Sequence, residues 1–471
     1  MFGITKRQFT YYRLTWVKHD LPAGLSVFLV ALPLCLGIAL ASGAPLYSGI
    51  LSGIIGGIVI GFISGSSLSV SGPAAGLTSL IAVAIVTAGD YRVFLLSVII
   101  AGLFQVLLGV FKLGAIANYF PSAVIKGMLA AIGIILISKQ IPYALGYAKA
   151  DFWNHTFTHL FTDNEQNAFF KQFNLNTSRK AIILTVISLI VYFIANKGWL
   201  KKIGFIPVSL LVVIIGILFN VFIQQLWPNS TLKALQLVDI PNNILGELQF
   251  PNFKALFSSA LIWQNGIIIG LVATLETLLC IEAVDKLDKH NRITPVNREL
   301  VAQGIGNMSC GLLGAIPVTS VIVRSAANVY AGGKTKLSAI THGLFLIISV
   351  LVFPFVINLI PYASLSAILL VTGYNLAKPK LFINMWQQGL KQFLPFVITI
   401  ICILATDLLK GVSIGLLISI YFIIQNNFQI EYHITKLKKH DTEEYLIKLN
   451  SNVSFLNKVQ LRKTLDAIPP Y

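Results

Sequence analysis

Charged residues are scarce in this chain. They make up 11% of its 471 residues, whereas hydrophobic residues make up 56%. A soluble globular protein carries about 25% charged residues, so this composition, with a mean hydropathy of +0.79, excludes a soluble globular domain. It predicts a polytopic membrane protein that is surrounded by the lipid bilayer.

Acidic residues are the scarcer of the two signs of charge. The chain has 18 Asp and Glu against 35 Lys and Arg, a formal net charge of +17. Such a balance can indicate nucleic acid, but the Lys and Arg residues fall mostly in short loops between apolar segments. This is the positive-inside pattern. It predicts no nucleic-acid partner, a bacterial-type inner membrane and cytoplasmic termini, with residues 1–20 as a cytoplasmic N-terminal segment.

Groups suited to metal or covalent chemistry are also few. The four cysteines lie inside apolar segments at no metal-ligand spacing, which predicts inert buried thiols. They are Cys35, Cys280, Cys310 and Cys402. His155 and His159 have a spacing that could bind a metal, but no further ligand accompanies them. Since no nucleophile and base pair is evident either, we expect neither an enzyme nor a resident cofactor.

Apolar segments follow one another between residues 21 and 427, and we count fourteen. They are 21–41, 48–64, 74–88, 94–110, 123–138, 181–195, 207–223, 261–284, 299–313, 319–331, 337–359, 365–376, 393–406 and 412–425. A span needs about 20 residues, so 74–88 and 319–331 are too short, and each is the third of its half. Because each half has an odd number of segments, the second half lies in the membrane in the opposite orientation to the first. The sequence predicts an all-α fold of 7+7 inverted repeats with two half-helices.

The polar stretch 64–73 precedes the first short segment. Irregular backbone at membrane depth survives only where protein or a cavity surrounds it, so we expect an extended segment leading into a half-helix near the midplane. Paired interrupted segments at matching places indicate a transporter's binding site. Half-helix N-termini carry unpaired N–H groups and partial positive charge. They therefore favour an anion.

Two charges stand in the apolar background close to these breaks. Glu276 lies in the middle of the eighth segment, and Arg324 lies in the tenth. A charge at the bilayer centre costs about 2.5 to 3.5 kcal/mol on insertion scales, so such residues usually line a cavity or a substrate path. Arg324 would supply positive field for the anion. A buried carboxylate beside an anion needs a proton or cation with it, which predicts H⁺ or Na⁺ coupling at Glu276.

Six short stretches carry a resemblance to a known family. They are LPLCLGIA at 32–39, SGPAAGLTS at 71–79, ETLL at 276–279, NRELVAQG at 297–304, PVTSVIVRSAAN at 317–328 and GGKT at 332–335. In this order and spacing the chain resembles the sulfate permease family (SulP), called solute carrier family 26 in animals, over nearly its whole membrane part. The stretch IVRSAANV at 322–329 looks most like the bacterial bicarbonate transporters of that family.

The resemblance implies an architecture shared with uracil permeases. A core domain of segments 1–4 and 8–11 is expected to move against a gate domain of segments 5–7 and 12–14. After residue 427, strand-like alternation and a short helix at 458–467 resemble a linker and the start of a STAS domain, so 428–471 is interpreted as an incomplete STAS-like segment. A homodimer is also expected.

The resemblance also implies the site residues. The positions that match substrate contacts are Leu34, Ile38, Ala74, Ala75, Glu276, Val323 and Arg324. The cation-coupling positions are Glu276, Cys280 and Thr319. Many relatives have a polar residue where this chain has Leu34, and several have Ser where it has Val323. Backbone N–H groups and Arg324 would then have to hold the anion.

Other polar residues have a structural interpretation. Hydroxyl groups near the breaks are expected to bond to the nearby backbone; these are Thr78, Ser79, Thr319 and Ser320. Asp285, Asn297 and Glu299 are expected to fix the connection between the eighth and ninth segments. We expect His342 to be a buried histidine with its hydrogen bonds satisfied.

The sequence leaves several functions open. Cation-coupled bicarbonate uptake by elevator-type alternating access is favoured, and proton-coupled sulfate symport or anion exchange is the alternative. An anion channel is a different class, in which Glu276 would serve no purpose. A nucleobase permease needs side-chain donors and acceptors, which Leu34, Ala74, Ala75 and Val323 do not offer.

Overall fold

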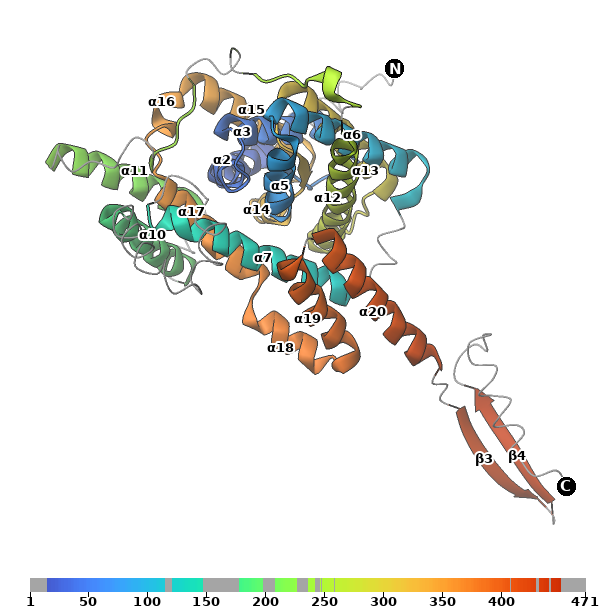
Figure 1. The fold of residues 1–471 in the computed structure, drawn as a ribbon. Helices are drawn as coiled ribbons and strands as arrows, with labels where there is room; N and C mark the ends of the chain where they lie inside the picture. The colour runs from blue at the N-terminus through green and yellow to red at the C-terminus, as the bar shows by residue number, and fades with distance from the viewer. Residues whose placement is uncertain are drawn as a thin grey trace, which may run out of the picture. The chain divides into compact units, whose positions relative to one another are not determined.

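The computed structural model describes most of the chain. The described residues are 15–114, 121–146, 178–197, 208–226, 236–241, 246, 248–257, 259–406, 408–428, 432–439 and 442–449. They fall into two compact units (Figure 1), the first within residues 1–119 and 132–378 and the second within 120–131 and 379–471.

The first unit contains both breaks. Its helices are η1 (Trp16–Asp20), α2 (Leu21–Ala41), α3 (Leu46–Ile55), η2 (Gly56–Ile60), α4 (Gly61–Ile63), η3 (Ala75–Leu77), α5 (Thr78–Ala88), α6 (Tyr91–Val110), α10 (Arg179–Lys197), α11 (Val208–Leu226), η8 (Phe253–Ala255), α12 (Ala260–Leu287), α13 (Val296–Leu313), α14 (Ile322–Tyr330), α15 (Leu337–Val352), α16 (Pro354–Ile357) and α17 (Tyr362–Leu376). Its strands are β1 (Ser71–Pro73) and β2 (Val318–Ser320). α7 (Ser122–Ala144) begins in the second unit and continues into the first.

The second unit is smaller. Its other elements are α18 (Pro379–Gln387), α19 (Leu390–Ala405), α20 (Leu408–Phe428), β3 (Tyr432–Lys439) and β4 (Thr442–Leu449). β3 and β4 form an antiparallel hairpin with Tyr432 opposite Leu449, which agrees with the strand-like pattern predicted after residue 427. The helix predicted at 458–467 lies outside the described residues, as do His155 and His159. The STAS-like interpretation stays a prediction.

Helix length and composition agree with a membrane location. Among the described residues, five helices are long and apolar enough to cross a bilayer. They are Trp16–Ala41, Leu46–Ile63, Tyr91–Val110, Ser122–Ala144 and Ala260–Leu287. Each segment predicted from the sequence contains a helix, so the predicted fold class is confirmed.

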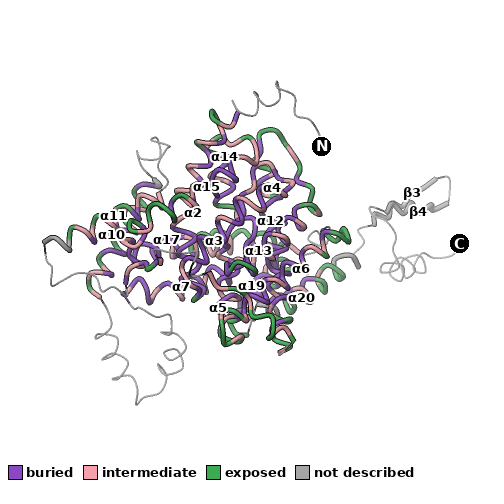
Figure 2. The backbone as a smooth tube through the Cα atoms, turned by 90° about the horizontal axis from the view of Figure 1, so that it is seen from above, coloured by how far each residue is buried: buried purple, intermediate pink, exposed green. Residues whose placement is uncertain are grey.

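Close packing inside the first unit depends on glycine. A Cβ on Gly102 of α6 would lie 2.5 Å from the carbonyl oxygen of Gly304 on α13, and a Cβ on Gly304 would lie 2.6 Å from that of Gly102. The two backbones therefore touch, as small residues permit between helices in a bilayer. Figure 2 shows how buried residues follow α12 and α13. This contact fixes α13 in the interior of the unit.

Corresponding helices of the two halves have matching neighbours. α2, the first segment of the first half, packs against α14 and α15. α12, the first segment of the second half, packs against α5 and α6. Each first segment thus contacts the third and fourth segments of the opposite half. This exchange of partners is the relationship expected of interleaved inverted repeats.

One strand from each half meets its counterpart at the breaks. β1 pairs antiparallel with β2, with Ser71 opposite Ser320 and Pro73 opposite Val318. Segments related by a two-fold axis in the membrane plane run in opposite directions, so antiparallel pairing fits inverted repeats. All residues of both strands are buried, so the pairing also satisfies backbone groups that would otherwise lack partners.

The two half-helices begin later than the sequence predicts. Ala74 is extended, with φ −111° and ψ 137°, and a 3₁₀ turn at Ala75–Leu77 precedes α5, which begins at Thr78. Thr319 lies in β2 rather than in a helix, and α14 begins at Ile322. The residues before each half-helix are extended because the two strands satisfy each other's backbone groups.

Candidate functional site

The half-helices α5 and α14 both begin at the strand pair. Because the strands are antiparallel, the chain leaves β1 at Pro73, opposite the start of β2 at Val318. α5 and α14 therefore leave the pair at opposite ends, each with its N-terminus there. First-turn N–H groups have no partner within the helix and carry partial positive charge. The strand pair is therefore a place that favours negative charge.

α2 and α12 flank this strand pair. α2 contacts β1, α5 and α14, and α12 contacts β2, α5 and α14. Leu34 and Ile38 lie one turn apart on α2 and are 6% and 3% exposed. Ala74 is buried and Ala75 half-buried, and both directly follow β1, so these two predicted residues lie at the end of the strand pair, whereas Leu34 and Ile38 are buried on the helix that contacts β1. Val323 differs, because its side chain is 47% exposed on the first turn of α14.

Glu276 lies against the start of the third segment. Both oxygens of its carboxylate are 2.8 Å from the point that a Cβ on Gly76 would occupy. Gly76 belongs to the 3₁₀ turn before α5, so the partial positive charge of that N-terminus acts on the carboxylate. The Oε2 atom is buried and has no hydrogen-bond partner among the described residues. The acid therefore has an unused acceptor beside a half-helix.

Cys280 lies one turn beyond Glu276 on α12. Its Sγ accepts a hydrogen bond of 3.1 Å from the Ser320 hydroxyl, and Thr277 Oγ1 accepts the N–H of Ser320 at 3.3 Å. The hydroxyl of Thr319 donates instead to the carbonyl of Ser320 at 3.2 Å. Neighbouring residues of a strand point to opposite faces, so the hydroxyl that β2 directs to Cys280 is that of Ser320, not Thr319.

Neither Ser69 nor Ser320 is among the site residues predicted from the sequence. Their hydroxyl groups are hydrogen-bonded to each other across 251 residues of sequence. The signal is the alternation of side chains along β2, which puts Ser320 on the α12 side once 318–320 is recognised as a strand. Thr78 bonds as predicted, because its hydroxyl donates to the carbonyl of Ala75 at 2.8 Å.

Arg324 is fully buried, with 0% exposure. Its Nη2 donates to Sγ of Cys35 on α2 at 3.3 Å. Its Nη1 lies 1.9 Å from the point that a Cβ on Gly72 would occupy, so only glycine at 72 leaves space for the guanidinium. Gly72 pairs with Thr319, and directly opposite residues share a face of the strand pair. Arg324 therefore lies on the face opposite the one that carries Ser320.

The buried guanidinium has no counter-charge among the described residues. Its Nε and Nη1 have no hydrogen-bond partner, and no carboxylate pairs with it. His342 on α15 is also 0% exposed and is close enough to interact electrostatically with Arg324. His342 is buried as predicted, but neither ring nitrogen has a hydrogen bond of normal length and angle within the described part of the chain. Leaving a buried charge unpaired costs several kcal/mol, so this region holds a strong positive field.

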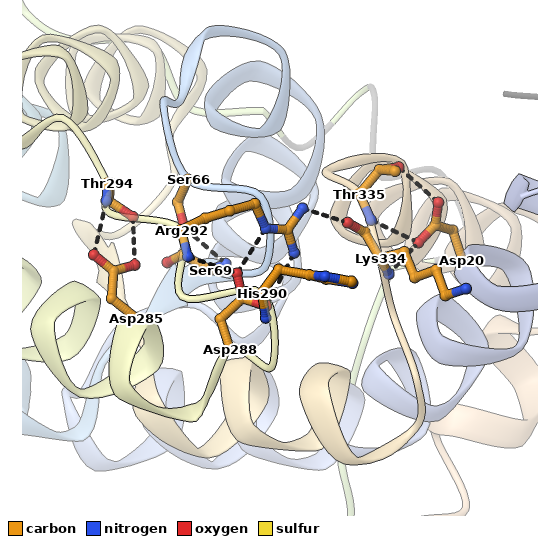
Figure 3. Close-up of polar contacts among 10 residues, drawn as sticks. All are labelled: Asp20, Ser66, Ser69, Asp285, Asp288, His290, Arg292, Thr294, Lys334 and Thr335. Atoms are coloured by element: carbon orange, nitrogen blue, oxygen red, sulfur yellow. Dashed lines mark hydrogen bonds and ion pairs between the residues drawn. The ribbon is translucent and has the colours of Figure 1, made fainter.

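A polar network lies at the loop end of α12. Asp285 accepts hydrogen bonds of 2.7 Å from the backbone N–H and from the hydroxyl of Thr294, which confirms that it fixes the connection to α13 (Figure 3). Asn297 accepts instead from the backbone N–H of Gly114 at 3.0 Å. Glu299 bonds to Ser64 rather than to this connection, so its predicted role is corrected.

Arg292 joins this loop to its neighbours. Its Nε donates to Asp288 at 2.6 Å and its Nη1 to the carbonyl of Lys334 at 2.8 Å. Asp20 accepts bonds from the backbone N–H groups of Lys334 and Thr335 at 2.7 and 2.9 Å. Figure 3 shows the Arg292 side chain between the carboxylate groups of Asp288 and Asp20. Burial raises the pKa of Asp288, but hydrogen bonds from Arg292 and the backbone outweigh it and hold that pKa below its ordinary value.

Comparison with known proteins gives the family. Residues 17–401 match the model of the sulfate permease family. YvdB of Bacillus subtilis (strain 168), named as a candidate sulfate transporter, is 29% identical over 443 residues, which cover 94% of this chain and 79% of YvdB. Bicarbonate transporter BicA of Picosynechococcus sp. is 25% identical over 427 residues, which cover 88% of this chain and 72% of BicA.

Solved structures share the fold. The transmembrane domain of a cyanobacterium bicarbonate transporter BicA has a TM-score of 0.70 at 22% identity, covering 86% of this chain and 97% of that one. Murine Slc26a9, an anion transporter in the inward-facing state, has a TM-score of 0.71 at 17% identity, covering 94% and 76%. With the family match over most of its length, the chain belongs to the sulfate permease family of anion transporters.

Proposed function

We propose that the chain is a secondary active transporter that takes up bicarbonate together with a cation by elevator-type alternating access. The observation that carries this proposal is the meeting of two half-helix N-termini at the β1–β2 pair with the unpaired, buried Arg324 beside it. Positive ends and a guanidinium without a counter-charge suit a small anion. The substrate would bind between Leu34, Ile38, Ala74 and Ala75 and the start of α14.

Coupling is assigned to Glu276. Its Oε2 has no hydrogen-bond partner among the described residues, so a proton or Na⁺ can bind there and neutralise the acid. Cys280 lies one turn along α12 from Glu276, and its Sγ accepts a hydrogen bond from the Ser320 hydroxyl at 3.1 Å. Hydroxyl and carboxylate oxygens suit Na⁺ better than a thiol does, so we assign Ser320 and Glu276 as the oxygen ligands.

Sulfate is the second candidate substrate. YvdB, at 29% identity, is named for sulfate, whereas BicA, at 25%, is named for bicarbonate. A proton-coupled sulfate symporter or an anion exchanger would use the same strand pair. An anion channel needs no coupling ion and would lose little when Glu276 loses its charge.

Uptake of labelled bicarbonate and of labelled sulfate into proteoliposomes tests these alternatives, with Na⁺ and pH gradients varied separately. We expect saturable bicarbonate uptake that depends on the Na⁺ gradient and loses this dependence in Glu276→Gln. Glu282→Gln is the matched control, because Glu282 lies on the same helix but is exposed and paired with Lys286. Uptake that is unchanged in Glu276→Gln, without Na⁺ or pH dependence, would exclude symport.

The membrane location, the division into domains and the oligomeric state are also proposals. We propose a bacterial-type inner membrane location, and the positive-inside pattern of the basic loops supports cytoplasmic positions for both termini. Core and gate domains, and assembly as a homodimer, follow the family pattern. Cysteine accessibility of single-cysteine variants from either side of the membrane would test the orientation, and crosslinking in membranes would test the dimer.

A further inference from the structure

α13 carries three polar side chains on its buried face. Glu299, Gln303 and Asn307 are four residues apart and each is 0% exposed. Residues at this spacing lie on one face of a helix. A buried polar group without a partner costs about 1 to 3 kcal/mol, so the reason for these three residues must lie in what they bond. Their hydrogen-bond partners include residues of both β1 and β2.

Asn307 holds β2. Its Oδ1 accepts the N–H of Val318 at 2.7 Å, and its Nδ2 donates to the carbonyl of Val318 at 3.0 Å. This pair of bonds to one residue imitates a neighbouring strand. The Nδ2 also donates to Oε1 of Gln105 on α6 at 2.7 Å. The amide therefore has a fixed orientation, and β2 is attached to the α6 and α13 pair.

Gln303 holds β1. Its Nε2 donates to the Ser71 hydroxyl at 2.6 Å and to Oε1 of Glu299 at 2.9 Å. The other oxygen of Glu299 accepts from the Ser64 hydroxyl at 2.5 Å. Since Oε1 of Glu299 accepts from the Gln303 Nε2, the nitrogen of that amide and not its oxygen must face Glu299. That requirement turns the Gln303 donor toward Ser71.

We infer that Gln303 and Asn307 are positioning residues for the anion site, oriented by Glu299 and Gln105. One rigid helix face bonds Ser71 of β1 and Val318 of β2, so it sets where both half-helix N-termini lie relative to each other. None of these side chains needs to touch the anion. The inference rests on the proposed function, because it assigns the affinity for the anion to the spacing of those N-termini.

A double-mutant cycle between Gln303→Met and Ser71→Ala tests the bond that holds β1. Ser71→Ala should raise the KM for the transported anion by about threefold to tenfold, as expected for one neutral hydrogen bond, and Gln303→Met by at least as much, because it also loses the bond to Glu299. The maximal rate per folded molecule should change less than KM. The double variant should be no worse than the poorer single variant, because both remove the same bond.

Ser309→Ala is the matched control. Ser309 lies on the same helix and bonds only within it, its hydroxyl donating to the carbonyl of Ile305 at 2.8 Å. Its KM should equal that of the native protein. Effects of the two single variants that multiply in the double variant, or single variants with native KM, would overturn the inference.

Amide hydrogen exchange separates this inference from the proposed function. Gln303→Met should exchange faster in residues 69–77 and Asn307→Asp faster in 316–324, whereas Ser309→Ala should match the native protein in both. If the native protein takes up neither anion, the proposed function fails and exchange still decides the inference. Native protection of both segments in the two variants would overturn it.

Discussion

Arg324 occupies the space that a side chain on Gly72 would take, since its Nη1 lies 1.9 Å from the position of that missing Cβ. The strand that carries Gly72 comes from the first half of the chain and the arginine comes from the second. The burial of the guanidinium therefore depends on both repeats.

Gly72→Ala should displace the guanidinium. Forcing extra atoms into a filled interior costs about 1 to 3 kcal/mol, so we expect a lower unfolding temperature and a higher KM for the anion. Both are measurable by thermal unfolding in detergent and by uptake. Gly61→Ala is the control, because its Cβ would first meet a side-chain atom of Ile340 at 3.1 Å. Equal effects of the two substitutions would contradict this explanation.

Arg324→Met should separate stability from transport. An uncompensated buried charge costs about 3 to 5 kcal/mol, and an apolar side chain of similar length does not carry that cost, so the unfolding temperature should rise. Anion uptake should fall by about tenfold or more, as expected from losing one charged hydrogen bond. Arg324→Lys keeps the charge and should retain more uptake than Arg324→Met. A less stable Arg324→Met protein would show that the arginine serves mainly to support the fold.

Gly76→Ala should disturb coupling. The new Cβ would lie 2.8 Å from both oxygens of Glu276, so the carboxylate must move away from the start of α5. We expect the Na⁺ or proton dependence of uptake to weaken while the maximal rate at high anion concentration is largely kept. The measurement is uptake at varied cation gradients. Cation dependence equal to that of the native protein would show that this position of the carboxylate is not needed.

Asp288→Asn should lower stability in a pH-dependent way. The pKa of Asp288 is lower in the folded protein than its ordinary value, owing mainly to Arg292 acting against burial. Its contribution is therefore complete above about pH 4, near the ordinary value for Asp, and is lost as pH falls through the lower folded pKa. The gap in unfolding temperature between variant and native protein should be present at pH 7 and shrink below about pH 4.

Glu282→Gln is the control for that pH series. The Glu282 and Lys286 side chains are 62% and 72% exposed, and exposed ion pairs contribute little to stability. We expect no measurable change in its unfolding temperature at either pH. A gap for Asp288→Asn that stays constant from pH 7 to pH 3 would contradict the role given to its charge.

The segments and their breaks could be predicted because they depend on local composition. The stretch 64–73 is polar, and the short segments 74–88 and 319–331 cannot cross. The pairing of Ser71 with Ser320 could not be predicted, because three-residue strands have almost no pattern of their own. That pairing decides the face on which each side chain lies, so Thr319 was favoured over Ser320.

The positions of the charges could be predicted better than their partners. Hydropathy alone picks out Glu276 and Arg324. The place of the Arg324 side chain depends on Gly72 and Cys35, which are distant in sequence and apolar or small. Nothing local to His342 shows that its ring nitrogens lack regular hydrogen bonds, since that depends on which helices surround it.

The β1–β2 pair also has a consequence for how the chain is made. Ser69 and Ser320, whose hydroxyl groups are hydrogen-bonded to each other, are 251 residues apart in the sequence. At ribosomal speeds of about 5 to 20 residues per second, β1 is synthesised roughly 10 to 50 s before β2. During that interval its backbone groups need other partners, such as water, a chaperone or the insertion machinery. The first half alone therefore cannot complete the strand pair, and the site forms only after the second half has been made.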